Sequence, residues 1–217
     1  METPCAPFDI DADGVQGYLH RPDGDPAGAV ALTHGAGGDC TSELLRAMAA
    51  GFAERGLLVL RYNLPFRQRR ASGPPHRAHA AQDRDGIVAA AAAVRALEDG
   101  PLILAGHSYG GRQSTMLAAE CPDVADALVL LSYPLHPPKK PEKSRIEHLP
   151  QLRTPSVFVH GDRDPFGTPD EMRAALELVP AEHRLILIEG GRHGLDPGRG
   201  DVVARTVDAA ADLTSGR

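Results

Sequence analysis

Ser108 lies in a Gly-x-Ser-x-Gly motif, and its residue type and surroundings suit a nucleophile. The motif follows an apolar run, residues 101–105, that predicts a buried strand, and it precedes a helix-compatible run, residues 112–120. Glycines on both sides permit a strand-to-helix turn too sharp for residues with a β-carbon. Such a turn projects the hydroxyl outward and directs the next N–H, that of Tyr109, to where an oxyanion would form. The motif predicts attack on a carbonyl carbon. A glycine-capped strand end with an incidental serine is the alternative.

A glycine-rich loop, residues 34–38 (HGAGG), follows a second predicted buried strand, residues 28–33. The loop could cradle a phosphate, but it lacks the Lys-Ser/Thr ending of a P-loop and the GxGxxG spacing. A second oxyanion donor fits better, because enzymes with this type of serine turn take one N–H from such an early loop. We predict Ala36 as that donor, with Gly37 as second choice, and we expect Gly35 and Gly37 to contact substrate.

Two later loops supply an acid and a histidine. A predicted strand at residues 155–160 leads into Asp162 and Asp164, and either carboxylate could orient a histidine while the other holds the loop. The last predicted strand, residues 184–189, leads into His193. The chain has ten histidines, but only His193 lies in a glycine-flanked loop after the last strand and downstream of the acid. The order serine, acid, histidine is one of the known orders of a Ser-His-Asp triad.

The remaining elements must position these loops. Further strands are predicted at residues 17–21, 57–62 and 127–131, and helices at residues 41–55, 80–97, 168–178 and 202–213. Strands that alternate with helices in this way specify an α/β fold, a mostly parallel sheet with helices on both faces. Because the carboxyl ends of parallel strands meet at one edge, the three loops are expected to converge there. We expect residues 1–217 to form a single domain.

Other residues at this edge are candidates for substrate contacts. Asn63 and Phe66 follow a predicted strand and could line the crevice, although Asn63 could equally cap the strand end. A proline-rich segment, residues 132–150, is expected to arch over the crevice as a minimal lid, too short for a cap domain. His136 in that segment and Phe166 in the acid loop are the remaining candidates.

Residues 67–79 carry four arginines and two histidines without an acidic residue. Runs of this kind are usually solvated loops, and a Ser-Gly-Pro-Pro stretch within it supports that interpretation. The alternative is that Arg67, Arg69 and Arg70 form a rim that attracts anions and favours acidic substrates. The two histidines are three residues apart, but no carboxylate or cysteine lies close to them in the sequence, so we expect no metal.

Composition narrows the class of protein. Of the 217 residues, 42% are hydrophobic and 24% charged, and 23 Lys and Arg against 29 Asp and Glu give a net charge of −6, which argues against a general nucleic-acid binder. The three cysteines have no CxxC spacing, so they indicate neither a disulfide framework nor a zinc site and suit a reducing compartment. No signal-peptide pattern or membrane-spanning apolar run is evident. We therefore expect a soluble, cytoplasmic protein without nucleic-acid or membrane partners.

Six short motifs carry a resemblance to a known family. They are residues 34–38 (HGAGG), 61–66 (RYNLPF), 106–112 (GHSYGGR), 133–138 (YPLHPP), 161–167 (GDRDPFG) and 191–193 (GRH). Over nearly its full length the chain resembles an α/β-hydrolase of the dienelactone-hydrolase-like branch. Within that branch it is most similar to the group that contains a vertebrate testis-expressed hydrolase-like protein and the hydrolase-like domain of a chromatin-complex subunit.

This resemblance implies an α/β-hydrolase fold without a cap domain. It also implies Asp164 as the acid, since the fold usually places the acid third after the glycine that Gly161 matches; Asp162 is then the bystander. Dienelactone hydrolases proper carry a cysteine nucleophile where Ser108 stands, so their specificity does not transfer. Many members of the closer group have methionine where Tyr109 stands.

Together these features predict a serine hydrolase, similar to carboxylesterases and thioesterases, that cleaves a small acyl ester through Ser108, His193 and Asp164. The N–H groups of Ala36 and Tyr109 would hold the oxyanion, and no cofactor or metal is required. The expected partner is a small ester or thioester, with an anionic one as an option because of the arginine-rich run. The alternative, of a different class, is a hydrolase-fold protein that serves as a binding or scaffolding module.

Overall fold

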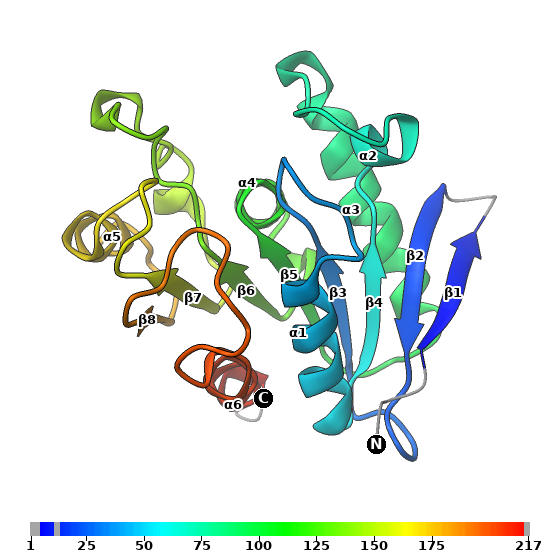
Figure 1. Ribbon diagram of the computed structural model, residues 1–217. Helices are drawn as coiled ribbons and strands as arrows, with labels where there is room; N and C mark the ends of the chain where they lie inside the picture. The colour runs from blue at the N-terminus through cyan, green and yellow to red at the C-terminus, as the bar shows by residue number, and fades with distance from the viewer. Residues whose placement is uncertain (1–4, 11–13, 215–217) are drawn as a thin grey trace.

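A twisted sheet of eight strands organises the chain, whose computed structural model describes residues 5–10 and 14–214 (Figure 1). The strands are β1 (Cys5–Ile10), β2 (Val15–His20), β3 (Ala29–Thr33), β4 (Leu58–Tyr62), β5 (Leu102–His107), β6 (Ala127–Leu131), β7 (Ser156–Gly161) and β8 (His183–Ile188). Their order is β1-β2-β4-β3-β5-β6-β7-β8. β2 runs antiparallel to β1 and β4, and the other pairs are parallel. The predicted mostly parallel sheet is confirmed.

Helices cover both faces of this sheet (Figure 1). They are α1 (Glu43–Glu54), α2 (Pro65–Arg69), α3 (Ala80–Arg95), α4 (Tyr109–Glu120), α5 (Pro169–Leu176) and α6 (Val202–Thr214). The apolar sides of α1 and α6 share one buried cluster, and those of α3, α4 and α5 share the other. Among the helices of the described residues, none has the length and apolar character to cross a membrane.

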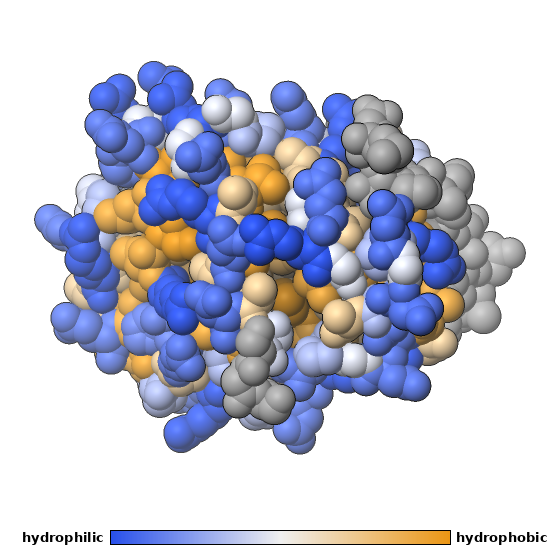
Figure 2. Space-filling view, turned by 90° about the horizontal axis from the view of Figure 1, so that it is seen from below, coloured by the Kyte–Doolittle hydropathy of each residue, from blue (hydrophilic) through white to orange (hydrophobic). Residues whose placement is uncertain are grey.

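The two clusters divide the side chains of each strand by alternation. In β3, Val30 and Leu32 belong to the cluster with α1 and α6, while Ala29 and Ala31 belong to the other. Because both faces are covered, all five residues of β3 are buried, which explains why the central strands appear in the sequence as continuous apolar runs. Figure 2 views the amino-end side of the sheet, where apolar residues show between polar and charged ones.

Two segments rise above the carboxyl edge of the sheet on either side of α4 (Figure 1). The first connects β4 to α3 and contains α2 and the short 3₁₀ turn η1 (Arg77–His79), where the sequence predicted a loop; Pro65 at the first helical position favours this extra helix. The second connects β6 to β7 and contains only the 3₁₀ turns η3 (Pro141–Lys143) and η4 (Leu149–Gln151). No separate cap domain is inserted within the described residues. A further 3₁₀ turn, η2 (Pro122–Val124), precedes β6.

Candidate active site

Ser108 occupies a strained turn between β5 and α4. Its φ of 48° and ψ of −109° are unusual for a residue with a side chain and mark a sharp change of chain direction. The glycines around it are required by close backbone approach, since a β-carbon on Gly106 would lie 2.4 Å from the nitrogen of Gly111. The sequence therefore folds here into the predicted strand-turn-helix arrangement, with Ser108 lining a cavity at the carboxyl edge of the sheet.

One hydrogen-bonded chain joins Ser108, His193 and Asp164. The Oγ of Ser108 lies 2.8 Å from Nε2 of His193, and Nδ1 of His193 lies 2.8 Å from Oδ2 of Asp164. Because a carboxylate only accepts, Nδ1 carries the proton and Nε2 is free to accept from the serine hydroxyl. The side chain of Asp164 is completely buried, and its other oxygen accepts the N–H of Phe166 at 2.9 Å. Asp162 is exposed, so the structure brings only Asp164 of the two candidate acids to the histidine.

Two neighbouring rings hold His193 in place. Phe166 stacks on its imidazole, with 4.1 Å between the ring centroids and 27° between the planes. His107, the residue before the serine, donates from Nε2 to the carbonyl of His193 at 2.8 Å. Burial lowers the pKa of His107 to about 4, so near neutral pH its ring is uncharged. His107 therefore positions the histidine loop as a neutral donor.

The glycine-rich loop lies directly against the serine turn. A β-carbon on Gly35 would lie 2.9 Å from Nδ1 of His107 and 3.3 Å from the β-carbon of Ser108, so only glycine allows this approach. Ala36 lines the same cavity as Ser108 and Tyr109. Tyr109 is the first residue of α4, and its N–H lies at the positive end of the helix dipole.

The side chain of Arg67 holds the glycine-rich loop in place. Its guanidinium donates to the carbonyls of Ala36 (3.0 Å), Gly38 (2.8 Å), Arg70 (3.2 Å) and Gly73 (3.2 Å). The residue is only 6% exposed, and its charge lies 5.0 Å from the ring centroid of Phe66. Arg67 is therefore part of the scaffold. The sequence suggested that Arg67, Arg69 and Arg70 form a rim that attracts anions. Arg67 does not take part in such a rim, because its donors are committed to backbone carbonyls.

His34 fixes the start of the loop as a neutral side chain. Its Nε2 accepts the N–H of Leu64 at 3.1 Å, so the proton lies on Nδ1, which donates to the carbonyl of Gly35 at 2.8 Å. Burial is the main reason that the pKa of His34 is lowered to about 4.

Asp83, on α3, is a buried carboxylate that sequence reasoning missed. It accepts the hydroxyl of Tyr109 at 2.7 Å on one oxygen and the N–H of Phe66 at 3.0 Å on the other. Burial and the nearby carboxylate raise the pKa of the Tyr109 hydroxyl above its ordinary value. A signal was present, since Asp83 stands four and eight residues before Ile87 and Ala91, on the buried face of the helix.

The cavity at the serine measures about 1470 Å³. Of the residues predicted to contact substrate, three line it: Gly35, Gly37 and Phe166. The proline-rich segment contributes Pro134, Pro137 and Ser144 to the wall, as expected of a short lid. No group of three His, Cys, Asp or Glu that could hold a metal ion occurs in the described part of the chain.

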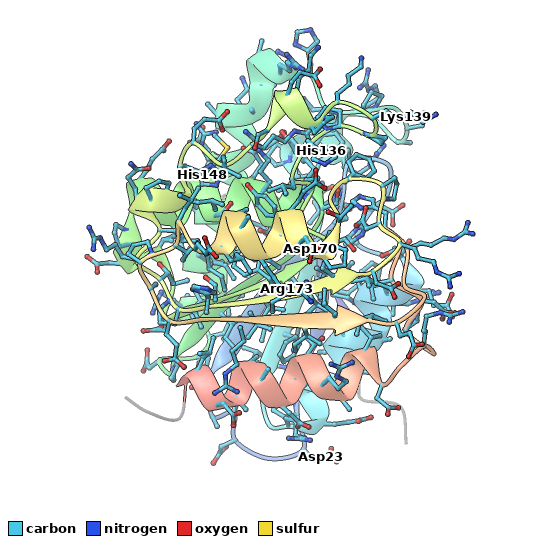
Figure 3. The ribbon with its side chains drawn as sticks, turned by 90° about the vertical axis from the view of Figure 1, so that its left-hand side faces the viewer. Asp23, His136, Lys139, His148, Asp170 and Arg173 are labelled. Atoms are coloured by element: carbon cyan, nitrogen blue, oxygen red, sulfur yellow. The ribbon has the colours of Figure 1, made fainter. Side chains whose placement is uncertain are left out.

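The other three residues predicted to contact substrate, Asn63, Phe66 and His136, are not among the described residues that line the cavity, and each has contacts elsewhere in the fold. Asn63 accepts the N–H of Cys40 at 2.9 Å, which ties β4 to the start of α1. Phe66 is only 5% exposed and belongs to the buried core. His136 contacts Glu171 at 3.4 Å, and Figure 3 shows it on the lid segment above α5.

Known structures share this fold. A dienelactone hydrolase from Anabaena variabilis is 21% identical, with a TM-score of 0.72 over 98% of this chain and 96% of that chain. Est1E from Butyrivibrio proteoclasticus is 18% identical, with a TM-score of 0.77 over 97% and 99%. XC6422 from Xanthomonas campestris, an α/β serine hydrolase without lid, is 19% identical, with a TM-score of 0.71 over 99% and 94%. The family described as alpha/beta hydrolase domain matches residues 26–214, and the chain therefore belongs to the alpha/beta hydrolase family.

Proposed function

We propose that the protein is a serine hydrolase that cleaves a small acyl ester or thioester, with Ser108 as nucleophile, His193 as base and Asp164 as orienting acid. The observation that carries the proposal is the continuous chain of two 2.8 Å hydrogen bonds through His193. This chain ends on a serine that lines an open cavity. Membership of the alpha/beta hydrolase family supports hydrolysis in general. The six motifs named above support placement in the narrower testis-expressed and chromatin-subunit group.

The geometry supports acyl transfer in two halves. In the first, Nε2 of His193 accepts the Ser108 proton as the hydroxyl oxygen attacks the carbonyl carbon. Collapse of the tetrahedral intermediate breaks the ester or thioester bond, and Nε2 returns that proton to the leaving group. In the second, water attacks the acyl-serine, His193 takes its proton, and Ser108 leaves reprotonated with release of the acid. Asp164 holds Nδ1 protonated throughout and stabilises the transient imidazolium.

Negative charge on the carbonyl oxygen needs donors that are already in place. We assign this task to the N–H of Tyr109, at the start of α4, and to the N–H of Ala36 on the opposing loop. Each such donor contributes on the order of 3 kcal/mol to the transition state. The braces from Arg67 and His34 support this assignment, because they fix the loop before substrate arrives.

A fluorophosphonate probe tests the proposal, since it labels only an activated serine. We expect the wild type to be labelled and to hydrolyse p-nitrophenyl acetate, and Ser108→Ala to do neither. Ser144→Ala is the matched control, because Ser144 also lines the cavity and should leave both readouts intact. A folded wild type that is neither labelled nor active would refute the proposal and favour the scaffolding alternative.

A further inference from the structure

Positive charge is concentrated in the cavity beside Ser108. Six Lys or Arg residues line the cavity against two Asp or Glu, although the whole chain has 23 of the former and 29 of the latter. Four of the six cations are Arg77, Arg112, Lys143 and Arg145. They come from α4 and from the two segments that rise on either side of it (Figure 1). The acidic residues are Glu43, from α1, and Asp196, from the His193 loop.

Arg112 lies one helical turn after the serine, and no described residue pairs with its charge. Its backbone N–H donates to the carbonyl of Ser108 at 2.9 Å, which fixes its place on α4. Its Nε is buried without a hydrogen-bond partner, and in the described residues no carboxylate pairs with its guanidinium. The scaffold arginine Arg67 differs, because carbonyl oxygens surround it. A buried cationic donor left unpaired is costly, so a ligand that supplied the missing acceptor would stabilise it.

Arg145 faces the same cavity from the lid. The hydroxyl of Tyr133 donates to its carbonyl at 2.6 Å, and its own N–H donates to the carbonyl of Leu135 at 2.9 Å, so its backbone is held on both sides. Burial and the charges of Arg112 and Arg77 lower the pKa of Arg145, while Tyr133 and Glu147 act in the opposite direction. The charges of Arg112 and Arg77 therefore lie close enough to act on Arg145, whose Nη1 donates to the carbonyl of Pro134 at 3.2 Å, and all three residues line the cavity.

We propose that Arg112, Arg145 and Arg77 form an anion subsite that holds a carboxylate or phosphate group of the substrate, one helical turn from Ser108. Guanidinium groups suit this role because they present two parallel donors to such a group. The bound anion would supply an acceptor to Arg112 and offset the effect of the Arg112 and Arg77 charges on Arg145. This inference rests on the proposed function, since it specifies the substrate class of the same site: esters with an anionic group a few bonds from the scissile carbonyl.

Matched pairs of esters test the subsite during turnover. In the first pair the acyl side differs: the mono-p-nitrophenyl ester of adipic acid against its neutral methyl ester. In the second the leaving group differs: acetylated 4-hydroxybenzoic acid against its neutral methyl ester. We expect the wild type to prefer the anionic member of at least one pair tenfold or more in kcat/KM, mainly through a lower KM.

Variants then locate the preference. Arg112→Gln and Arg145→Gln should each reduce the ratio between anionic and neutral esters to below threefold, and having two variants keeps the test valid if one does not fold. Arg69→Gln is the matched control, because Arg69 is exposed and lies outside the cavity, so that this substitution removes the same charge elsewhere. The subsite is overturned if the wild type prefers neither anionic ester, or if Arg69→Gln reduces the ratio as much as Arg112→Gln.

A binding experiment separates this inference from the proposed function. Calorimetric titration of Ser108→Ala with adipate and with inorganic phosphate should show binding of at least one, and show which anion is preferred. Ser108→Ala/Arg112→Gln should bind that anion at least tenfold more weakly. Anion binding by a protein without esterase activity would refute the proposed function and leave the subsite standing. Ester hydrolysis without anion binding or preference would refute the subsite alone.

Discussion

Replacement of Arg67 by methionine tests whether the glycine-rich loop must be held rigid for catalysis. The change removes four hydrogen bonds from a guanidinium to backbone carbonyls, two of them on Ala36 and Gly38. A hydrogen bond to a charged group contributes about 1.5–3 kcal/mol, so the two on the loop together hold it with roughly 3–6 kcal/mol. That equals or exceeds the value of one oxyanion donor, about 3 kcal/mol. If the loop is released, the Ala36 donor is lost, and kcat should fall by roughly 10²-fold.

The assay is kcat and KM for p-nitrophenyl acetate, with thermal melting to show that the variant is folded. We expect kcat to fall while KM changes little, because an oxyanion donor acts in the transition state. Arg67→Lys should recover only part of kcat, since an ammonium cannot reach carbonyls on both sides as a guanidinium does. Arg69→Met is the control for loss of charge. A folded Arg67→Met protein with kcat within twofold of wild type would show that the loop needs no brace.

Three further predictions concern single side chains. Asp164→Asn should lower kcat roughly 10⁴-fold, because the histidine loses its tautomer control, whereas Asp162→Asn should be mild; a reversed pattern in steady-state kinetics would contradict the acid assignment. The pKa of His34 is about 4 when folded and near 6.5 when unfolded, so the unfolded state binds more protons between these values and stability falls as pH drops. Between pH 7 and 5 this costs on the order of 2 kcal/mol, and urea unfolding of His34→Gln should show a drop smaller by about that amount. Asp83→Ala should lower the free energy of unfolding by roughly 2–5 kcal/mol because two buried donors lose their acceptor, whereas the exposed Asp85→Ala should cost under about 0.5 kcal/mol.

The residues proposed for the chemistry were predictable because each follows its own strand. Ser108, Asp164 and His193 lie after β5, β7 and β8, which are parallel, and a parallel sheet brings its carboxyl ends to one edge. The local sequence thus determines the position of each loop, and topology determines that the loops meet. The choice of Asp164 over Asp162 depended on the family resemblance, since both residues occur in the same short loop.

The supporting residues were not predictable in this way. Arg67 and Ala36 are 31 residues apart in the sequence, and Asp83 and Tyr109 are 26 apart. Neither separation follows from the periodicity of a helix or a strand. The four arginines within residues 67–79 suggested solvent or substrate, yet Arg67 points inward because α2, which the sequence did not predict, turns that residue toward the loop. Local patterns report which face of an element is buried, but a polar side chain that satisfies distant carbonyls has the same local pattern as an exposed one.

The structural role that serine most often has at a helix start does not apply to Ser108. Serine at an N-cap usually accepts a hydrogen bond from an N–H in the first turn, and its loss costs about 0.5–2 kcal/mol. Ser108 is the N-cap residue of α4, but its hydroxyl makes no such bond and instead contacts His193. The same position carries a strained φ of 48°.

These features indicate that the hydroxyl of Ser108 does not stabilise the fold, which stability measurements can test directly. Ser108→Ala should melt at the same temperature as the wild type or higher, because no cap is lost and the helix-start backbone is unchanged. Thr168→Ala is the matched control, since Thr168 caps α5 in a full capping box with Glu171 and its loss should cost about 1 kcal/mol. If Ser108→Ala lost as much stability as Thr168→Ala, the hydroxyl would serve the fold. The geometry at residue 108 would then no longer favour catalysis over structure.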